Sequence, residues 1–296
     1  MSQWLAKAQE SRAGRVLTFP VRASQRSYVT FLNKLRVDSF DEMTAALARN
    51  GTSEQAESDA AANFINIATG RGKLGAMENG AAALNTAFFA PRYVVSRFQF
   101  IAGQPLYRGT AATRKLVAKE YGRYMVGLGV VYGLAKLAGG DVEYDPRSSD
   151  FGKIRFGNTR LDPLSGLSQV ITVTSKVASG TRKTGSGKVV PVRGEKIPFP
   201  GTDTADVIGS FARTKLAPMF SIPLDVISGQ NVVGEPVTVG STLKSAVVPL
   251  AMRDIYEAMV DQGVPRGTAI GLLSLLGMGL QTYQERRPKQ KSTEKK

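Results

Sequence analysis

The sequence predicts a mainly α-helical protein that carries one small β-hairpin and one basic loop. Over several segments apolar residues recur three and four positions apart, which is the spacing of one helix face. Around residues 150–161 short apolar runs instead flank a Gly-Asn pair, a pattern typical of a tight hairpin. Residues 181–201 are rich in glycine, proline and basic side chains, which favours a loop or a β-arm.

The N-terminal part is expected to contain a short arm followed by a long helix. Residues 1–23 are predicted to form a flexible arm with an extended piece at residues 16–19. The helix that follows repeats Tyr28, Phe31 and Leu35 at helical spacing, and Gly51 is expected to end it.

Two motifs point toward ligands but fail on their context. Gly70 to Gly75 fit the pattern GxGxxG, yet a predicted helix precedes them where a dinucleotide-binding unit needs a strand. The acidic run that starts at Asp141 has Pro146 and Gly152 at the sixth and twelfth positions, where a calcium loop needs glycine and glutamate. We therefore expect a glycine linker and a solvated acidic turn, with no cofactor and no metal.

The middle of the chain is predicted to hold two helices. The first, residues 81–101, is expected to kink or restart at Pro91 and to place its aromatic residues in the core. Those residues are Phe88, Phe89, Tyr93, Phe98 and Phe100. The second opens at Thr110 with a basic half and continues with an apolar half over residues 124–139, interrupted by Lys136. This run is shorter than the roughly 20 residues that cross a bilayer, so we expect it to be buried in the protein.

Two Asp-Pro pairs bracket the predicted hairpin, because a residue before proline is disfavoured in a helix. Asp162 is expected to cap a helix whose first residue is Pro163 and whose end is Gly180. Gly157 and Asn158 supply the tight turn between the strands. The residues that define this element are Asp145, Pro146, Gly157, Asn158, Asp162 and Pro163.

The C-terminal part is expected to be helical up to a basic tail. Asp203 or Thr204 is predicted to start a helix, and Gly263 to end a later one. Residues 267–284 carry no charge and are the strongest membrane candidate, although their glycines lower the apolarity. Residues 285–296 are predicted to be a disordered tail. Residues 24–284 then form one helical module, in which the composition shifts near 139–201 allow a subdivision.

The chain has no cysteine and no histidine. This absence excludes disulfides, Cys/His zinc sites and every catalytic dyad or triad that needs either residue. A Ser-Lys pair is still open, since Ser148 and Ser149 lie near Lys153, but turn hydrogen bonds account for these serines equally well. We predict that the protein is not an enzyme.

The balance of charge favours an acidic partner. The net charge is +15 and the sequence pI is about 10.1, values that suit nucleic acid, anionic lipid or an acidic protein. Basic residues of the loop and of the tail are the predicted contacts to phosphates or to an anionic surface. They are Arg182, Lys183, Lys188, Arg193, Arg286, Arg287, Lys289 and Lys291.

Four long segments carry a family resemblance. They are RSYVTFLNKLR (26–36), NTAFFAPRYVVSR (85–97), GGDVEYDPRSSDFGKIRFGNTRLD (139–162) and DIYEAMVDQGVPRGTAIGLLSLLGMGLQTY (254–283). Together they resemble the C-terminal region of large polyvalent proteins of tailed bacteriophages, over about residues 20–284. In that family the enzymatic domains lie upstream of this region, so the resemblance transfers no catalytic residue.

The resemblance implies a protein carried inside the capsid and delivered to the host envelope or cytoplasm. We expect a non-enzymatic virion-associated or ejected (internal) protein that acts through assembly, with membrane association during DNA delivery as one version. The alternative is an accessory protein that binds nucleic acid without sequence preference. The expected partners are other virion proteins or further copies of the chain, and then DNA or an anionic membrane.

Overall fold

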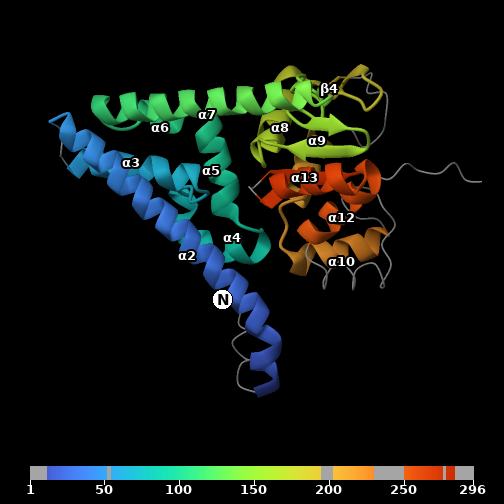
Figure 1. Ribbon diagram of the computed structural model, residues 1–296, viewed down its shortest axis with the longest axis horizontal. Helices are drawn as coiled ribbons and strands as arrows, with labels where there is room; N and C mark the ends of the chain where they lie inside the picture. Colours follow the sequence, from blue (N-terminus) through green and yellow to red (C-terminus); the bar gives the residue numbers. More distant parts are fainter. Residues whose placement is uncertain (1–11, 52–54, 195–202, 230–249, 276–277, 284–296) are drawn as a thin grey trace, which may run out of the picture. The chain divides into compact units, whose positions relative to one another are not determined.

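In the computed structural model the chain is mainly helical with a small antiparallel sheet, which confirms the predicted fold class (Figure 1). The structure describes residues 12–51, 55–194, 203–229, 250–275 and 278–283. The chain divides into two compact units. Unit 1 comprises Met1–Lys73 and Arg92–Tyr121, and unit 2 comprises Leu74–Pro91 and Gly122–Lys296. These boundaries lie outside the 139–201 region in which the composition allowed a subdivision.

Unit 1 is entirely helical in its described residues. Its elements are α2 (Arg12–Arg49), α3 (Gln55–Ala68), α5 (Pro91–Ile101), α6 (Gln104–Tyr107) and the first half of α7 (Ala111–Leu137). Its buried apolar side chains include Leu47, Ala61, Ile65, Ile67 and Val117. Gly72 lies directly against α5, because a Cβ there would be 2.5 Å from the backbone nitrogen of Ser96. The glycine motif therefore provides a close backbone contact within unit 1.

The N-terminal helix is longer than predicted. α2 begins at Arg12, so residues 12–23 are helical and the extended piece expected at residues 16–19 is absent from the structure. Helix growth adds one hydrogen bond per residue once a nucleus exists, so the strong pattern after residue 24 extends through the weaker residues before it. Residues 1–11 of the predicted arm lie outside the described residues.

Pro91 starts α5, as the sequence predicted, and the chain breaks before it, where Ala90 has a φ of 49°. The prediction for the aromatic residues is wrong for Phe89, Tyr93 and Phe98, which are exposed. Because of the break, the residues before and after Pro91 belong to separate helices and share no single apolar face. Phe100 does pack inside unit 1, where its ring stacks on Tyr121.

Unit 2 is built on a four-stranded antiparallel sheet in the order β1-β2-β3-β6. The strands are β1 (Asp141–Val142), β2 (Ile154–Phe156), β3 (Thr159–Asp162) and β6 (Gly279–Thr282). β2 and β3 form the predicted hairpin, with Phe156 opposite Thr159 and Gly157-Asn158 as the turn. Gly157 has a φ of 54°, a left-handed conformation that glycine adopts without strain. β6 pairs with β3 from the far end of the chain.

Two helices and the second half of α7 cover this sheet. The helices are α12 (Leu250–Gln262) and α13 (Val264–Leu275), and they are separated by Gly263, as predicted. The core consists of Ala135, Val142, Ile154, Leu161, Ala258, Ile270 and Leu280. The run proposed as a membrane segment thus provides most of α13 and all of β6. Among the described residues, no helix is both long and apolar enough to cross a membrane.

α8 (Leu167–Ser179) starts later than predicted. Asp162 belongs to β3, and its carboxylate accepts hydrogen bonds from the backbone N–H of Leu164 and the hydroxyl of Ser168. An aspartate that bonds to the backbone two residues ahead makes a turn of its own. The prediction that Asp162 caps the helix and that Pro163 is its first residue is therefore wrong. The predicted end at Gly180 is confirmed.

The remaining elements of unit 2 come before α7 or between α8 and α12 in the sequence. They are η1 (Gly75–Gly80), α4 (Ala81–Ala87), β4 (Thr181–Lys183), β5 (Val189–Pro191), α9 (Thr204–Arg213) and α10 (Pro218–Ser228). β4 and β5 form a hairpin, so the expected basic loop or β-arm has β structure where it is described. Asp203 caps α9 by accepting the backbone N–H of Asp206, which confirms the predicted start.

Candidate association surface and basic pocket

The second half of α7 exposes an uncharged surface. Residues 124–135 contain no charged side chain. Val131, Tyr132 and Ala135 pack on the sheet of unit 2. The opposite side of the helix carries residues three and four positions apart that alternate between glycine and apolar side chains, and we call this side the α7 stripe. The α7 stripe consists of Gly122, Val126, Gly129, Val130, Gly133 and Leu137.

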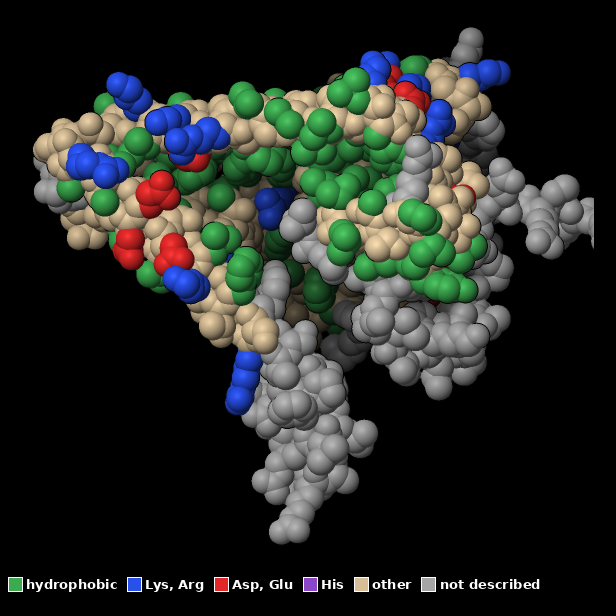
Figure 2. Space-filling view, viewed as in Figure 1, with side chains coloured by type: hydrophobic (Ala, Val, Ile, Leu, Met, Phe, Trp, Pro, Cys, Tyr) green, Lys and Arg blue, Asp and Glu red, His purple; other side chains and the backbone are tan. Residues whose placement is uncertain are grey.

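The α7 stripe is open to solvent along its length. Val126, Val130 and Leu137 are 69%, 55% and 87% exposed. Figure 2 shows hydrophobic side chains along this helix. The prediction that the run is buried is confirmed for the side that packs on the sheet and is wrong for the α7 stripe, because an apolar pattern does not say whether the covering surface belongs to the same chain. Single exposed apolar residues are ordinary, whereas a contiguous uncharged set indicates an interaction site.

Gly129 and Gly133 of the α7 stripe pack against nothing in the part of the chain that the structure describes. A Cβ added at Gly129 or Gly133 would have no atom within 4 Å. Glycine inside a helix costs about 1 kcal/mol relative to alanine, so these positions lower the stability of the helix without an internal benefit. Small residues on a helix let another backbone approach closely, and this surface is shaped for such an approach.

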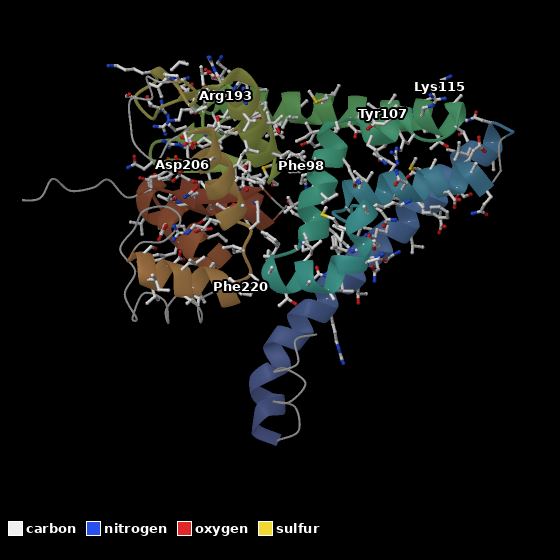
Figure 3. All side chains as sticks on the ribbon, turned by 180° about the vertical axis from the view of Figure 1, so that it is seen from behind. Phe98, Tyr107, Lys115, Arg193, Asp206 and Phe220 are labelled. Carbon is white, nitrogen blue, oxygen red and sulfur yellow. The ribbon has the colours of Figure 1, made fainter. Side chains whose placement is uncertain are left out.

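The basic residues predicted to contact phosphates have different surroundings on the β4–β5 hairpin. Lys183 donates to the carboxylate of Glu143 at 2.6 Å, so its charge is compensated. Lys188, between β4 and β5, and Arg193, just after β5, are exposed; Arg193 is labelled in Figure 3. Arg182 instead lines a pocket. Arg286, Arg287, Lys289 and Lys291 lie outside the described residues.

The acidic turn after β1 pairs with cations from its own neighbourhood. Asp145 accepts two hydrogen bonds from the Arg147 guanidinium, and these bonds lower the pKa of Asp145 from 3.8 to about 2. Lys153 donates to Asp150 at 2.9 Å. Within the residues that the structure describes, there is no group of three or more acidic side chains that could hold a metal ion.

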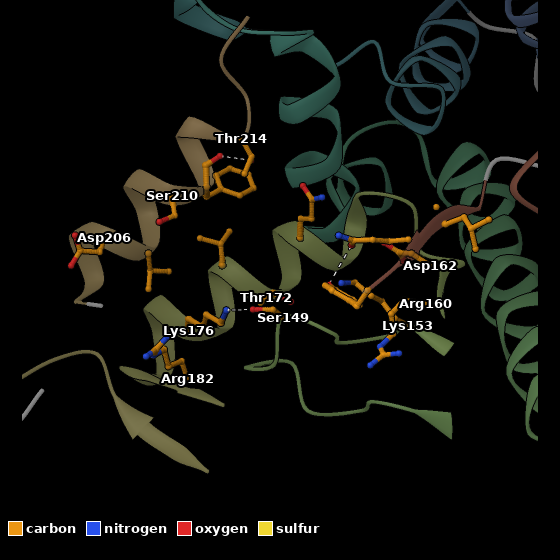
Figure 4. A pocket seen from close by; sticks show the side chains of 18 residues that line it. Ser149, Lys153, Arg160, Asp162, Thr172, Lys176, Arg182, Asp206, Ser210 and Thr214 are labelled. Atoms are coloured by element: carbon orange, nitrogen blue, oxygen red, sulfur yellow. Dashed lines mark hydrogen bonds between the residues drawn. The ribbon is translucent and has the colours of Figure 1, made fainter. Parts of the chain in front are cut away.

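A pocket of about 570 Å³ lies between α8, α9 and the strands β3, β4 and β6 (Figure 4). Its lining combines basic, hydroxyl and apolar side chains. The cationic residues are Lys153, Arg160, Lys176 and Arg182, and the acidic residues are Asp162 and Asp206. Apolar side chains from α8, α9 and β6 complete it, namely Val173, Val207, Phe211 and Leu280.

Positive charge exceeds negative charge on the α8 side of the pocket. Lys153 and Arg160 share the carboxylate of Asp150, at 2.9 and 3.4 Å. Lys176 donates to the neutral hydroxyl of Ser149 at 3.0 Å, and in Figure 4 its side chain lies beside that of Arg182. Burial lowers the pKa of Lys176, and the charges of Arg182 and Lys153 lower it further. The like charges are therefore close enough to repel one another.

The two acidic residues of the lining are already engaged with the backbone. Asp162 accepts backbone N–H groups in the turn before α8, and Asp206 accepts the N–H of Asp203 at the start of α9. These bonds hold both carboxylates in local structure. Both keep their negative charge, so the lining holds four cationic and two acidic side chains.

The structure pairs a serine with a lysine, although with a different lysine from the one nearby in sequence. Ser149 accepts from Lys176, whereas Lys153 bonds to Asp150. Ser148 is buried, and its hydroxyl accepts the backbone N–H of Asp150. Lys176 lies 27 residues from Ser149, so no local pattern reveals their contact. The one available signal is a lysine near the end of an otherwise uncharged helix.

Comparison with known proteins identifies no relative of this chain. A scan against protein-family models, a search of curated proteins and a search of solved structures each found no match.

Proposed function

We propose that this chain is a non-enzymatic assembly protein, virion-associated or ejected, of the kind found in tailed bacteriophages, and that its copies associate through the α7 stripe. The exposed, uncharged and glycine-bearing side of α7 is the observation that carries the proposal. The resemblance to large polyvalent phage proteins supplies the biological setting.

A second copy of the chain suits the α7 stripe better than a charged partner does. The chain carries a net charge of +15, so two copies repel each other over most of their surfaces. The uncharged run of α7 is a place where two copies can meet without bringing like charges together. In a two-fold dimer, Val126 and Val130 of one copy would pack over Gly129 and Gly133 of the other.

The expected affinity is moderate. Fully burying an apolar side chain of this size contributes about 1.5 kcal/mol at the lower end of the usual range. Val126, Val130 and Leu137 from two copies then contribute roughly 9 kcal/mol, against a cost of association of at least about 4 kcal/mol. The difference of about 5 kcal/mol corresponds to a dissociation constant of roughly 0.2 mM, so we expect a dimer that forms at high micromolar concentrations and above and not an obligate oligomer.

Sedimentation velocity over a range of protein concentrations tests this association. Val126 and Val260 are matched, because they are 69% and 68% exposed and only Val126 belongs to the α7 stripe. The wild type and Val260→Glu are expected to show a concentration-dependent dimer, whereas Val126→Glu is expected to stay monomeric. A monomeric wild type at every concentration, or equal behaviour of the two variants, would overturn the proposal.

The phage setting has its own test. Mass spectrometry of purified particles is expected to detect the chain among the virion proteins. Repeated absence from pure particles would remove the virion role and would leave the measurement of self-association intact.

Nucleic-acid binding without sequence preference is the second candidate, and the exposed side chains of Lys188 and Arg193 favour it. Binding to phosphates releases counterions, so its affinity must fall steeply as salt rises. A gel-shift series at increasing salt checks this. A salt-insensitive shift, or no shift at low salt, would dismiss it.

A further inference from the structure

The pocket in unit 2 is lined by more cationic than acidic side chains and by an apolar surface from α8, α9 and β6. Lys176 and Arg182 lie side by side on α8 and β4, and Lys153 also lines the space (Figure 4). Lys176 is bonded to a neutral serine hydroxyl, and the charged side chains that lower its pKa are the cations Arg182 and Lys153. Like charges held close together repel one another, and an anion placed between them would offset this repulsion.

Phosphate is the anion that suits this arrangement best. It carries close to two negative charges and three strong acceptor oxygens, so it can accept from an ammonium, a guanidinium and a hydroxyl together. The pocket supplies one donor of each kind: the ammonium of Lys176, the guanidinium of Arg182 and the hydroxyl of Ser149. A carboxylate has one charge and two oxygens and would leave more of the positive charge uncompensated.

The size and the apolar wall of the pocket limit the rest of the ligand. Small-molecule sites in proteins usually measure about 300–1,000 Å³, and this pocket of about 570 Å³ is in that range. Val173, Val207 and Phe211 provide apolar surface for an uncharged body attached to the phosphate. Nucleic acid bound along its backbone uses open basic surface instead.

We infer that the pocket binds a small phosphate monoester of about nucleotide size, with the phosphate held by Lys176 and Arg182 and the organic body against α8 and α9. This site is separate from the α7 stripe, so it does not depend on self-association. The phosphate could belong to a free nucleotide or to the 5′ end of a nucleic acid strand, and the two sources share this chemistry.

Titration calorimetry at low salt tests the site with four probes: AMP, adenosine, and a short single-stranded oligonucleotide with and without a 5′ phosphate. AMP is expected to bind and adenosine to fail. If the pocket serves strand ends, the phosphorylated oligonucleotide binds at least as well as AMP and the unphosphorylated one does not; if it serves free nucleotides, AMP binds better. No binding of either phosphate monoester would overturn the inference.

Two substitutions that each remove one positive charge distinguish binding in the pocket from general electrostatic attraction. Lys176→Gln removes a cation from the pocket, and Lys188→Gln removes one from the exposed turn of the neighbouring hairpin. Lys176→Gln is expected to weaken AMP binding about tenfold or more, the worth of one charge-assisted hydrogen bond, and Lys188→Gln less than about twofold. Equal weakening would show that the pocket is not the site.

A second measurement remains informative if Lys176→Gln alters the fold. NMR titration of the Lys176 side chain in the wild type, with and without AMP, follows the ammonium directly. A bound phosphate is expected to raise the pKa of Lys176 back toward its ordinary value. An unchanged Lys176 titration at saturating AMP would place the ligand elsewhere and contradict the inference.

Discussion

The sheet core of unit 2 and the α7 stripe use glycine in opposite ways. At Gly267 an added Cβ would lie 2.3 Å from the Cα of Met259, and at Gly140 it would lie 2.8 Å from the side chain of Ile154. At Gly129 and Gly133 it would meet nothing within 4 Å. In the core, neighbours in the same chain demand glycine. In the α7 stripe no described neighbour demands it, so a surface from outside the chain is the simplest cause.

The largest difference is expected between a leucine in the core and an exposed leucine of α7. Leu161 in β3 is 1% exposed, and Leu134 in α7 is 62% exposed. Leu161→Ala is expected to lower the free energy of unfolding by about 3 kcal/mol, because it leaves a cavity in the core. Leu134→Ala is expected to change it by less than about 0.5 kcal/mol. Urea unfolding at low protein concentration measures both variants. Comparable losses in the free energy of unfolding would contradict this prediction.

Alanine substitutions at glycine sharpen the comparison. Gly267→Ala forces atoms of α12 and α13 apart and is expected to destabilise the protein by about 2 kcal/mol or more. Gly129→Ala meets open space and is expected to stabilise the monomer by up to about 1 kcal/mol, through helix propensity. Thermal unfolding at low concentration checks the opposite signs. If the α7 stripe pairs two copies, Gly129→Ala also weakens the dimer, since the added methyl group holds the helices apart.

A substitution in the pocket is expected to change the free energy of unfolding less than the glycine substitutions do. Folding lowers the pKa of Lys176, so the charged form is disfavoured in the folded state. This destabilisation is complete below the lowered pKa and disappears as pH rises to the unfolded value of about 10.5. Lys176→Gln is therefore expected to stabilise the free protein slightly near neutral pH, because solvent screens much of the repulsion. A loss of stability in urea would contradict this.

The smallest effect is expected at the acidic turn. Because Arg147 lowers the pKa of Asp145 from 3.8 to about 2, this pair contributes stability above pH 3.8 that is lost as pH falls through about 2. Asp145→Asn should flatten the dependence of stability on pH in that window. Asp141→Asn is the control, since Asp141 pairs with Arg155 in an exposed position. Identical acid unfolding of the wild type and Asp145→Asn would refute the prediction.

Local features of the fold could be predicted from the sequence. The turn at Gly157-Asn158 and the cap at Asp203 depend on residues within a few positions of one another. The prediction for Asp162 was wrong, because the same residue types make either a helix cap or a turn before the helix. The pairing of β6 with β3 joins distant parts of the chain, and no local pattern carries that information.

The candidate sites also depend on contacts that no local sequence pattern reveals. Composition indicated a basic protein, yet it could not show that Lys183 is compensated by Glu143 while Arg182 faces a pocket with Lys176. The uncharged run of α7 was visible in the sequence, but hydrophobicity alone cannot distinguish a core from an interface. Only the fold shows that its glycines lie away from every neighbour within the described chain.

Disulfide cross-linking tests most directly whether two copies meet at the α7 stripe. The chain has no cysteine, so a single introduced cysteine has no competing partner. Under mild oxidation Val130→Cys is expected to give a covalent dimer, because in a two-fold pair residue 130 lies over Gly129 of the other copy and so beside its own counterpart. Val260→Cys, which is exposed on α12, is expected to stay monomeric. Equal cross-linking at both positions, or none at Val130→Cys, would contradict the account.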